Sequence, residues 1–155
     1  VRQYLPGDLT KVTVCTTPPW RFPAPDVKLD IPGIKKKSDM PMVVILQVTM
    51  SHIYGNHLSR THVYTDGPST SDSSTCCVVI PSHCTTVRFK LSHITSSTMS
   101  ELVAIHQALQ IILTKSSNSW TIFSDSKPAL QAISAFLRRG QNDQVVFEIM
   151  TLLMQ

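Results

Sequence analysis

The sequence predicts an α/β domain built on a mixed sheet, in which an antiparallel meander of three strands is joined by one parallel strand. Two observations support this fold class. Three short β-type segments follow one another between residues 61 and 91, with turn residues between them. Helical patterns then flank a fourth β-type segment between residues 98 and 138, which is typical of a strand–helix–strand crossover to a parallel strand.

The four predicted strands are short runs rich in β-branched and aromatic residues that end at turn or loop residues. They cover Thr61–Thr65, Cys76–Ile80, Thr86–Leu91 and Trp120–Ser124. The first ends at Asp66-Gly67, a turn signal, and the second ends at Pro81. The third alternates apolar and polar side chains, which predicts a strand with one face in the core and the other face exposed.

Three helices are predicted from apolar side chains that recur at helical spacing. They cover Thr98–Leu113, residues 126–138 and Gln144–Leu153. Pro128 is tolerated in the first turn of the second helix, and Gly140 fits the position that follows its end. Asp143 is expected to cap the third helix.

Residues 1–58 differ in composition from the domain that we expect over residues 59–155. Most of the 10 prolines lie in residues 1–41, where they exclude a long helix or a central strand. The basic run Lys35-Lys36-Lys37 allows two interpretations, a linker that binds nucleic acid through these lysines or one that is merely solvated. We therefore expect a proline-rich, basic linker or N-terminal extension over residues 1–58.

The last part of this extension, residues 42–57, has no clear period. A strand from Val43 to Val48 and a helix through Met50 and Ile53 are both compatible with it. The sequence leaves this choice open.

Composition and cysteine content indicate a globular protein. Of the 155 residues, 42% are hydrophobic and 15% are charged, which excludes a disordered chain. The net charge of +4 suits a polyanionic partner without establishing one. No cysteine pair has the C-x-x-C spacing of a zinc site, so we expect four buried, small apolar residues in a reducing compartment: Cys15, Cys76, Cys77 and Cys84.

The sequence also predicts where the protein acts. The N-terminal segment Val1–Pro6 has no apolar signal core. The longest apolar run, Met42–Leu46 with Val48 and Met50 beyond it, falls far short of the roughly 20 residues that span a bilayer. We therefore expect an intracellular protein, in the nucleus or cytoplasm, that is not secreted and has no membrane partner.

Three carboxylates are singled out by their positions. Asp66 closes the first predicted strand and Asp125 closes the fourth. If these strands lie side by side and parallel, both carboxylates meet at one edge of the sheet, where ligand sites of open α/β sheets gather. Glu101 lies in the first turn of the first helix, on the apolar stripe that faces the sheet.

This placement predicts a site for divalent metal ions. Burying Glu101 beside two other carboxylates is unfavourable, because desolvation and like-charge repulsion both oppose it. A hard cation such as Mg²⁺ or Mn²⁺ prefers oxygen ligands and removes the conflict. Two such ions about 4 Å apart activate a water and stabilise the leaving oxygen in phosphodiester cleavage, which requires acidic residues and no Ser–His pair.

Each carboxylate also has a purely structural interpretation. Asp66 fits a turn, and Asp125 fits the cap of the helix that follows it, as does Ser126. Thr98 and Glu101 have the spacing of a capping box, in which the glutamate only reaches back to the helix start. The metal hypothesis therefore rests on the joint placement of the three carboxylates.

These residues also lie in motifs that resemble those of type 1 ribonuclease H domains. The similar segments are the first-strand motif His62–Gly67, the helix motif Thr98–Ile105 and the fourth-strand motif Ile122–Leu130, within a match from about His62 to Glu148. The sequence is most similar to ribonuclease H regions attached to reverse transcriptases of non-LTR retrotransposons. That similarity extends to Phe89–His93, Arg138–Gly140 and Asp30–Lys37.

The resemblance implies a ribonuclease H-like fold and cleavage of the RNA strand of RNA–DNA hybrids. It implies that Asp66, Glu101 and Asp125 are catalytic and bind two Mg²⁺ or Mn²⁺ ions. It further implies nucleic-acid contacts by Gly67, Ser97, Thr98 and Ser126, although the three hydroxyl residues also fit helix caps. Hydroxyl side chains suit the 2′-hydroxyls and phosphates of such a duplex. The implied partners are an RNA–DNA hybrid and a reverse transcriptase domain.

The sequence departs from the family pattern in two places. Family members have a fifth strand, a histidine loop and a final helix with a fourth carboxylate, whereas this sequence ends at Gln155. We therefore expect an incomplete domain that lacks the last strand and helix and binds a second ion weakly. Pro68 stands where the family has a free backbone N–H. The alternative function is a catalytically degenerate module that binds nucleic acid or packs against a polymerase.

Overall fold

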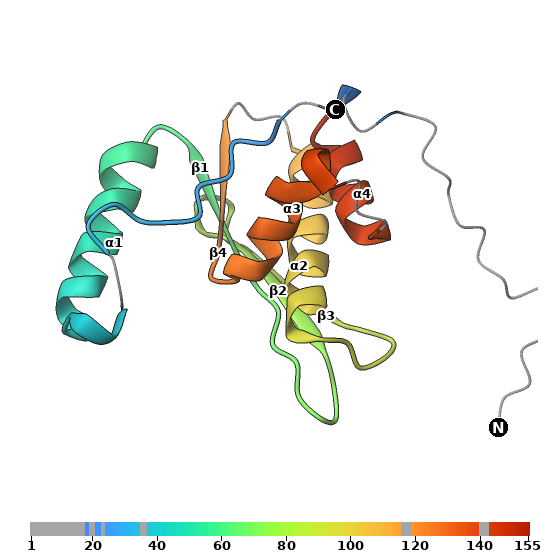
Figure 1. The fold of residues 1–155 in the computed structure, drawn as a ribbon, viewed down its shortest axis with the longest axis horizontal. Coiled ribbons are helices and arrows are strands. Elements are labelled where there is room, and N and C mark those ends of the chain that lie inside the picture. Colours follow the sequence, from blue (N-terminus) through green and yellow to red (C-terminus); the bar gives the residue numbers. More distant parts are fainter. Residues whose placement is uncertain (1–17, 19–20, 23, 35–36, 116–118, 140–142) are drawn as a thin grey trace, which may run out of the picture.

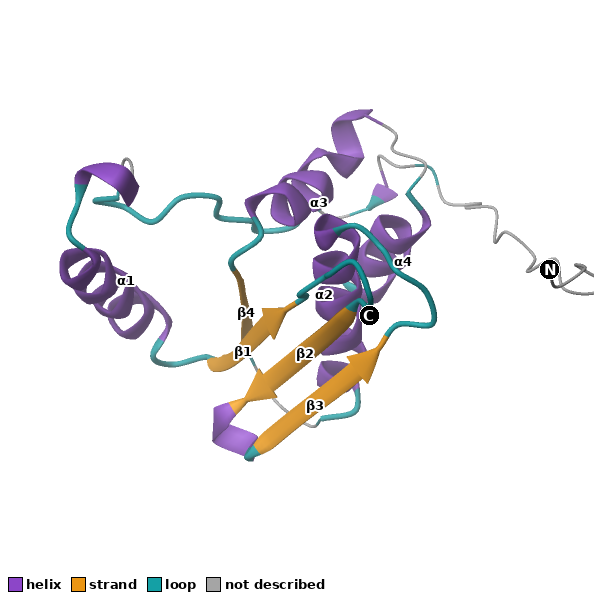
Figure 2. Ribbon diagram, turned by 90° about the horizontal axis from the view of Figure 1, so that it is seen from below, coloured by secondary structure: helices purple, strands orange, loops and turns teal. Residues whose placement is uncertain are grey.

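The computed structural model describes residues 18, 21–22, 24–34, 37–115, 119–139 and 143–155. Within them, a four-stranded sheet has the order β3-β2-β1-β4 (Figure 2). Its strands are β1 (Thr61–Asp66), β2 (Thr75–Ile80), β3 (Thr85–Lys90) and β4 (Trp120–Ser124). The first three form an antiparallel meander, and β4 pairs parallel to β1. The predicted mixed α/β sheet is therefore confirmed.

Three helices pack together on one side of the sheet (Figure 2). They are α2 (Ser97–Leu113), α3 (Lys127–Arg139) and α4 (Gln144–Leu152). Helix α2 contacts β1, β2 and β4 directly, and α3 and α4 pack against α2. Asp143 caps α4 as predicted, since its carboxylate accepts hydrogen bonds from the backbone amides of Val145 and Val146.

The apolar core has two parts, one on each side of α2. Towards the sheet, Ala108 packs with Val63, Val78 and Ile80, and all four side chains are fully buried. On the other side, α2 packs with α3 and α4 through a larger set of buried residues, Leu102, Ile105, Leu109, Ala129, Ile133, Phe136, Val146, Ile149 and Met150. Helix α2 is thus the central element of the domain, and its position is defined by apolar contacts along its length.

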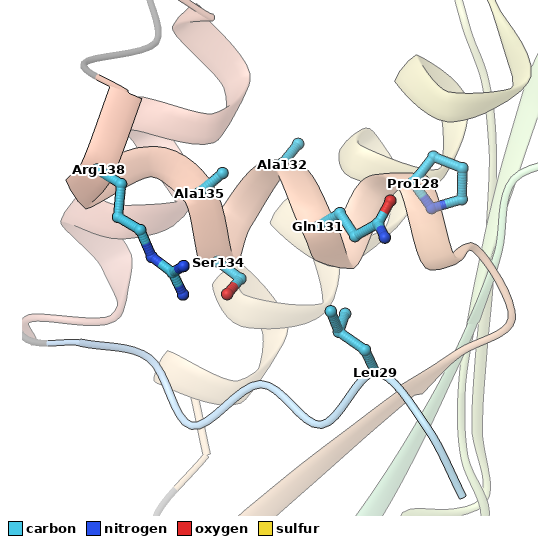
Figure 3. A pocket seen from close by; sticks show the side chains of 7 residues that line it. All are labelled: Leu29, Pro128, Gln131, Ala132, Ser134, Ala135 and Arg138. Carbon is cyan, nitrogen blue, oxygen red and sulfur yellow. The ribbon is translucent and has the colours of Figure 1, made fainter.

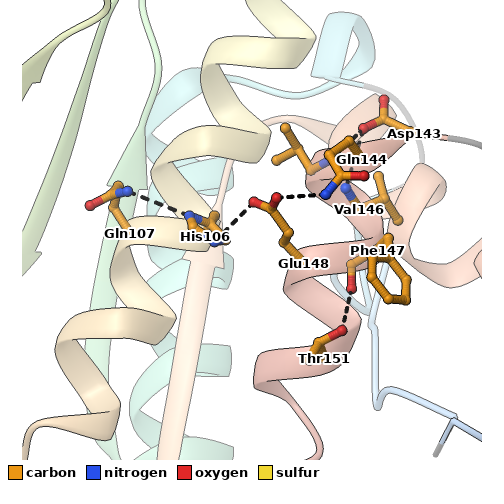
Figure 4. A network of polar contacts seen from close by, with 9 residues as sticks. His106, Gln107, Asp143, Gln144, Val146, Phe147, Glu148 and Thr151 are labelled. Carbon is orange, nitrogen blue, oxygen red and sulfur yellow. Dashed lines mark hydrogen bonds and ion pairs between the residues drawn. The ribbon is translucent and has the colours of Figure 1, made fainter. Parts of the chain in front are cut away.

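A polar contact also joins α2 to α4 (Figure 4). His106 Nε2 lies 3.5 Å from Glu148 Oε2, and Gln144 donates a hydrogen bond to the other carboxylate oxygen at 2.8 Å. His106 is mostly buried, whereas Glu148 is partly open to solvent. Both carboxylate oxygens of Glu148 are therefore engaged, one by His106 of α2 and the other by Gln144 of α4.

The segment before β1 contains helix α1 (Met42–His57), so the helical alternative for this segment is correct. Helix α1 lies apart from the other helices (Figure 1). It meets the sheet through the ring of His57, which contacts Phe123 of β4, and through the His57 carbonyl, which His62 of β1 approaches at 2.8 Å. Earlier in the chain, Lys37–Asp39 form the short 3-10 helix η2.

The described part of residues 18–34 contacts the helices of the domain through two side chains. Phe22 is buried among Phe136 and Phe147, with edge-on ring contacts at 5.5 and 5.9 Å. Further along, Leu29 lines a cavity of about 540 Å³ against α3 (Figure 3). The segment therefore packs on the helical layer. Lys35 and Lys36 lie outside the described residues, and binding of nucleic acid by the basic run stays a prediction.

The cysteine prediction holds in one case. Cys76 is buried, but Cys77 is only half-buried and Cys84 is exposed, so the expectation of four buried cysteines is wrong. Cys84 follows the 3-10 turn η3 (Pro81–His83) with a φ of 47°, a left-handed conformation that places it at the tip of the β2–β3 hairpin. Cys15 lies outside the described residues. None of the described helices has the length and apolar character needed to cross a membrane.

Candidate metal site at the carboxyl edge of the sheet

Parallel pairing of β1 and β4 places two acidic residues at the same edge of the sheet. Thr65 is paired with Ser124 in register, so Asp66 and Asp125 follow at equivalent points on the two strands. Both side chains are exposed. This is the arrangement expected when a helix crosses over between two parallel strands.

Glu101 reaches the same edge from the second turn of α2. The helix begins one residue before the predicted start, and its N-cap is Ser96, whose hydroxyl accepts a hydrogen bond from the Met99 amide. The predicted capping box of Thr98 and Glu101 is therefore wrong. Glu101 is 6% exposed, so its side chain is turned inwards and not back along the helix surface.

Gly67 allows α2 to approach the end of β1. A Cβ atom at this position would lie 2.4 Å from the Glu101 amide nitrogen and 2.7 Å from the Ser100 carbonyl oxygen. Both contacts involve backbone atoms of the helix, which cannot move aside as a flexible side chain can. Glycine is therefore needed at position 67 because it lets the backbone of α2 pack closely against the end of β1.

The three carboxylates converge. One oxygen each from Asp66, Glu101 and Asp125 lies within 4.8 Å of the others, in the part of the chain that the structure describes. Burial raises the pKa of the Glu101 carboxyl, and the charges of Asp125 and Asp66 add to the shift, whereas the Gly67 amide and the Ser124 hydroxyl counteract it. Within the acidic cluster, as we call these three residues, ionisation of Glu101 is therefore disfavoured unless a cation offsets it.

The second oxygen of Glu101, Oε2, provides a test of whether a cation fits here. It is buried and has no hydrogen-bond partner among the described residues. A buried carboxylate oxygen without a donor is unfavourable, and a hard cation at the cluster supplies the missing partner. The donor set consists of carboxylate oxygens, which suit Mg²⁺ or Mn²⁺ better than softer metals.

Comparison with known families agrees with this geometry. A family model described as RNase H matches residues 59–150, which is more than half of the chain. The chain belongs to the RNase H family. RNase H domains act on RNA–DNA hybrids and use divalent metals, so the fold and the acidic cluster are those expected of such a domain. No curated protein sequence matches this RNase H chain.

A network of hydroxyl groups holds the two loops beside the acidic cluster of this RNase H domain. The hydroxyls of Ser69 and Ser74 lie 2.8 Å apart, and both lie within hydrogen-bond distance of the Thr95 carbonyl oxygen, at 2.6 and 3.3 Å. The Thr95 amide donates back to Ser74 at 2.8 Å, and its hydroxyl lies 2.8 Å from that of Ser100. The β1–β2 loop is thus tied to the start of α2.

Sequence reasoning missed this network. The hydroxyl-rich composition of residues 69–75 was visible, but the partners Thr95 and Ser100 lie more than 20 residues away in the sequence. Both Ser74 and Ser100 are buried, with 1% and 0% exposure, so their hydroxyls act inside the protein. Buried hydroxyls with satisfied hydrogen bonds fix the relative positions of the elements that carry them. Here those elements bear Asp66, Gly67 and Glu101.

The four residues predicted to contact nucleic acid lie within four positions of a cluster residue in the sequence of the RNase H domain. Gly67 is buried, Ser97 is exposed, and Thr98 and Ser126 are half-buried. Ser126 also caps α3, because its hydroxyl accepts a hydrogen bond from the Ala129 amide at 3.4 Å. Ser126, and not Asp125, therefore caps this helix. The Asp125 carboxylate belongs to the acidic cluster instead.

Proposed function

We propose that this chain is a divalent-metal-dependent endonuclease that hydrolyses the RNA strand of RNA–DNA hybrids. The observation that carries the proposal is the convergence of three carboxylate oxygens within 4.8 Å at the carboxyl edge of the sheet. We assign the catalytic role to Asp66, Glu101 and Asp125, which would hold Mg²⁺ or Mn²⁺. When bound, such ions supply an activated water and stabilise the leaving oxygen of a phosphodiester.

The three residues of the acidic cluster differ in exposure, and we assign them different roles accordingly. Glu101 is buried and braced by the Gly67 amide and Ser124, so it provides the immobile part of the site. Asp66 and Asp125 are exposed, which leaves them accessible to a duplex. Their position on adjacent strands fixes their separation, since the paired backbones cannot drift apart without breaking the sheet.

Hydroxyl groups near the cluster support a nucleic-acid substrate. We infer that Ser97, Thr98 and Ser126 contact the duplex. We also infer that Gly67, which has no side chain, lets the backbone of the nucleic acid come close to the acidic cluster. A serine hydroxyl that accepts a bond from a helix amide, as Ser126 does, keeps its own hydrogen free to donate to a phosphate oxygen. Contacts to phosphates and 2′-hydroxyls suit recognition of an A-form-like duplex by shape.

We further propose that the chain derives from a retrotransposon protein in which a reverse transcriptase domain is its partner, within the cell. The sequence phrases that resemble non-LTR retrotransposon ribonuclease H regions support this context. One of them, Phe89–His93, extends from β3 into the loop that leads towards α2. An intracellular location, in the nucleus or cytoplasm, stays a prediction.

The test is cleavage of a labelled RNA–DNA hybrid in Mg²⁺. We expect Asp125→Asn to reduce the turnover rate at least about a hundredfold, because it removes one charge from the group that holds the ions. Asp72→Asn is the matched control, since Asp72 is an exposed acidic residue of the β1–β2 loop outside the cluster. Equal cleavage by the wild type and Asp125→Asn would reject the assignment.

One observation favours a second candidate, a module that binds the hybrid without cleaving it. Pro68 follows Gly67 directly and has no N–H, so the backbone offers no donor at this point beside the cluster. Its carbonyl is engaged by the Thr75 amide, which leaves the loop shape intact. Salt-sensitive binding of the hybrid with no product in Mg²⁺ would support this candidate over the nuclease.

A further inference from the structure

A line of residues runs from the acidic cluster across the outer face of the sheet. Asp66 is paired in register with Cys77 of β2, and Cys77 is paired with Arg88 of β3. Directly paired residues of neighbouring antiparallel strands point to the same face of the sheet. Two strand spacings of about 4.8 Å separate the first and last backbones, so Arg88 begins about 10 Å from Asp66.

A second basic residue lies beside Arg88 on the same face. Lys90 is paired with Thr75 of β2, two positions along the strand, so both basic side chains leave the outer face and both are exposed. Successive residues on one face of a strand are about 6.8 Å apart, which leaves room for each side chain to bind a separate phosphate. Val87 and Phe89 between and beside them turn to the inner face.

The same residues line a depression in the surface. It has a volume of about 530 Å³, and its lining includes Asp66 of β1, Cys77 of β2, and Arg88 and Lys90 of β3. Asp66, a member of the acidic cluster, forms one end of this depression, and the two basic residues form the other. A ligand lying in it would meet both.

Two other basic side chains of the described residues are already neutralised by ion pairs. Lys127 lies 2.7 Å from Asp30, and Lys28 lies 3.1 Å from Asp26. Among the described residues, Arg88 and Lys90 take part in no ion pair. Their positive charge is therefore available to a ligand, and it stands beside a cluster that would by itself repel a polyanion.

We propose that Arg88 and Lys90 form a phosphate-binding track. This track binds backbone phosphates of the duplex that neighbour the phosphate to be cleaved at the acidic cluster. The proposal rests on the proposed function, since it takes the RNA–DNA hybrid as the ligand. Arginine suits the task because its planar guanidinium binds two oxygens of one phosphate, and lysine adds a point charge. The track orients the strand across the sheet and contributes binding without taking part in bond cleavage.

The experiment measures binding of a labelled RNA–DNA hybrid in Ca²⁺ at several salt concentrations, and its cleavage in Mg²⁺. The variants are Arg88→Gln, Lys90→Gln and the double variant. Lys28→Gln is the control, because it removes the same charge from an exposed ion pair in the N-terminal segment. Arg88→Lys is a second control that keeps the charge and loses the paired hydrogen bonds.

We expect Arg88→Gln to weaken binding about tenfold at low salt. In each single variant the slope of log affinity against log salt should fall by about one, and in the double variant by about two. In Mg²⁺, KM should rise while kcat stays unchanged, which separates a track residue from a catalytic one. Arg88→Lys should retain the salt slope. The substituted positions are exposed, so thermal unfolding midpoints should match the wild type.

The double variant would overturn the track if its affinity and salt slope equalled those of Lys28→Gln. Failure of the proposed function has a different signature. If the wild type binds the hybrid but yields no product in Mg²⁺, the nuclease assignment fails, and the binding measurements still decide the track. If the wild type cleaves and the double variant has the same KM as the Lys28→Gln control, the track fails and the nuclease assignment stands.

Discussion

Helices α2 and α1 are similar in length, with 17 and 16 residues, and both are rich in aliphatic side chains. Among their described side chains, α2 buries seven residues, including Glu101, whereas α1 buries Ile53. Met42, Val43, Leu46, Met50 and Tyr54 of α1 are all exposed. Hydrophobic content is thus no guide to the role of a helix, and the site is attached to the helix that is packed on both sides.

The difference arises from where each helix meets its neighbours. Helix α2 lies between the sheet and α4, so it buries two sides, Ala108 towards the strands and Leu109 towards the helices. Helix α1 meets the sheet at His57, near its C-terminal end. Because the position of Glu101 must be held precisely against the repulsion of two aspartates, it benefits from the better-packed helix.

The largest effect expected from this comparison is on stability. Leu102 of α2 is 2% exposed, and Leu102→Ala should lower the free energy of unfolding by about 2–5 kcal/mol through lost burial and the cavity left behind. Met50 of α1 is 44% exposed, and Met50→Ala should change it by less than about 0.5 kcal/mol. Chemical denaturation of both variants measures the difference, and similar losses would show that α1 is as firmly packed as α2.

The next effect concerns the contact between α2 and β1. Gly67→Ala would force a Cβ atom against the helix backbone, so we expect α2 to shift and stability to fall by about 1–3 kcal/mol. Turnover of the hybrid should fall more than stability explains, because the carboxylates separate. The comparison variant is Gly55→Ala in α1, where a Cβ would meet nothing within 4 Å, and a helical alanine should stabilise. Wild-type turnover in Gly67→Ala would contradict the role assigned to Gly67.

Much of the α2 region was predictable from sequence. The strand order, the parallel pairing of β1 with β4 and the convergence of Asp66, Glu101 and Asp125 follow from local patterns and from the handedness of a crossover. The helix cap was misassigned because Ser96 and Thr98 are both good cap residues, and the choice depends on where the preceding loop is held. That loop is held by Ser74 and Thr95, a contact between distant parts of the sequence.

The α1 region was less predictable, for physical reasons. Residues 42–57 carry apolar side chains on all sides, so neither a helical nor a strand period stands out. The burial of Phe22 could not be predicted, because the surrounding prolines indicate an extended segment but not whether that segment packs against the domain. Its partners Phe136 and Phe147 lie more than 100 residues further along the sequence, in α3 and α4, so local patterns do not indicate the contact.

A smaller effect is expected at the buried carboxylate of α2. Since the pKa of Glu101 is raised in the folded protein, its ionised form opposes folding, and metal-free protein should lose stability as pH rises through that pKa. Glu101→Gln removes the charge and should raise the unfolding free energy at neutral pH by roughly 1 kcal/mol. The same variant should lose the stabilisation that Mg²⁺ gives the wild type. Thermal unfolding with and without Mg²⁺ checks both signs, and a destabilised metal-free variant would refute the argument.

The smallest effect is at the contact that attaches α1. Burial lowers the pKa of His57, and the neighbouring charges of His52, Arg60 and His62 lower it further, whereas Asp26 opposes them. The folded state therefore favours the neutral ring, whose Nδ1 is buried without a partner among the described residues. Stability from this contact is present above the ordinary pKa of 6.5 and is lost as pH falls through the lowered value.

Acidification should accordingly loosen α1 and leave α2 in place. Amide chemical shifts of α1 residues should change as pH is lowered below 6.5, whereas those of α2 residues away from His106 should change little over the same range. His57→Gln should reduce the α1 response, because the substituted side chain does not titrate, and the response that remains should be confined to the surroundings of His52. If α1 and α2 responded together, the two helices would belong to one cooperative unit, and the contrast in their packing would not extend to their dynamics.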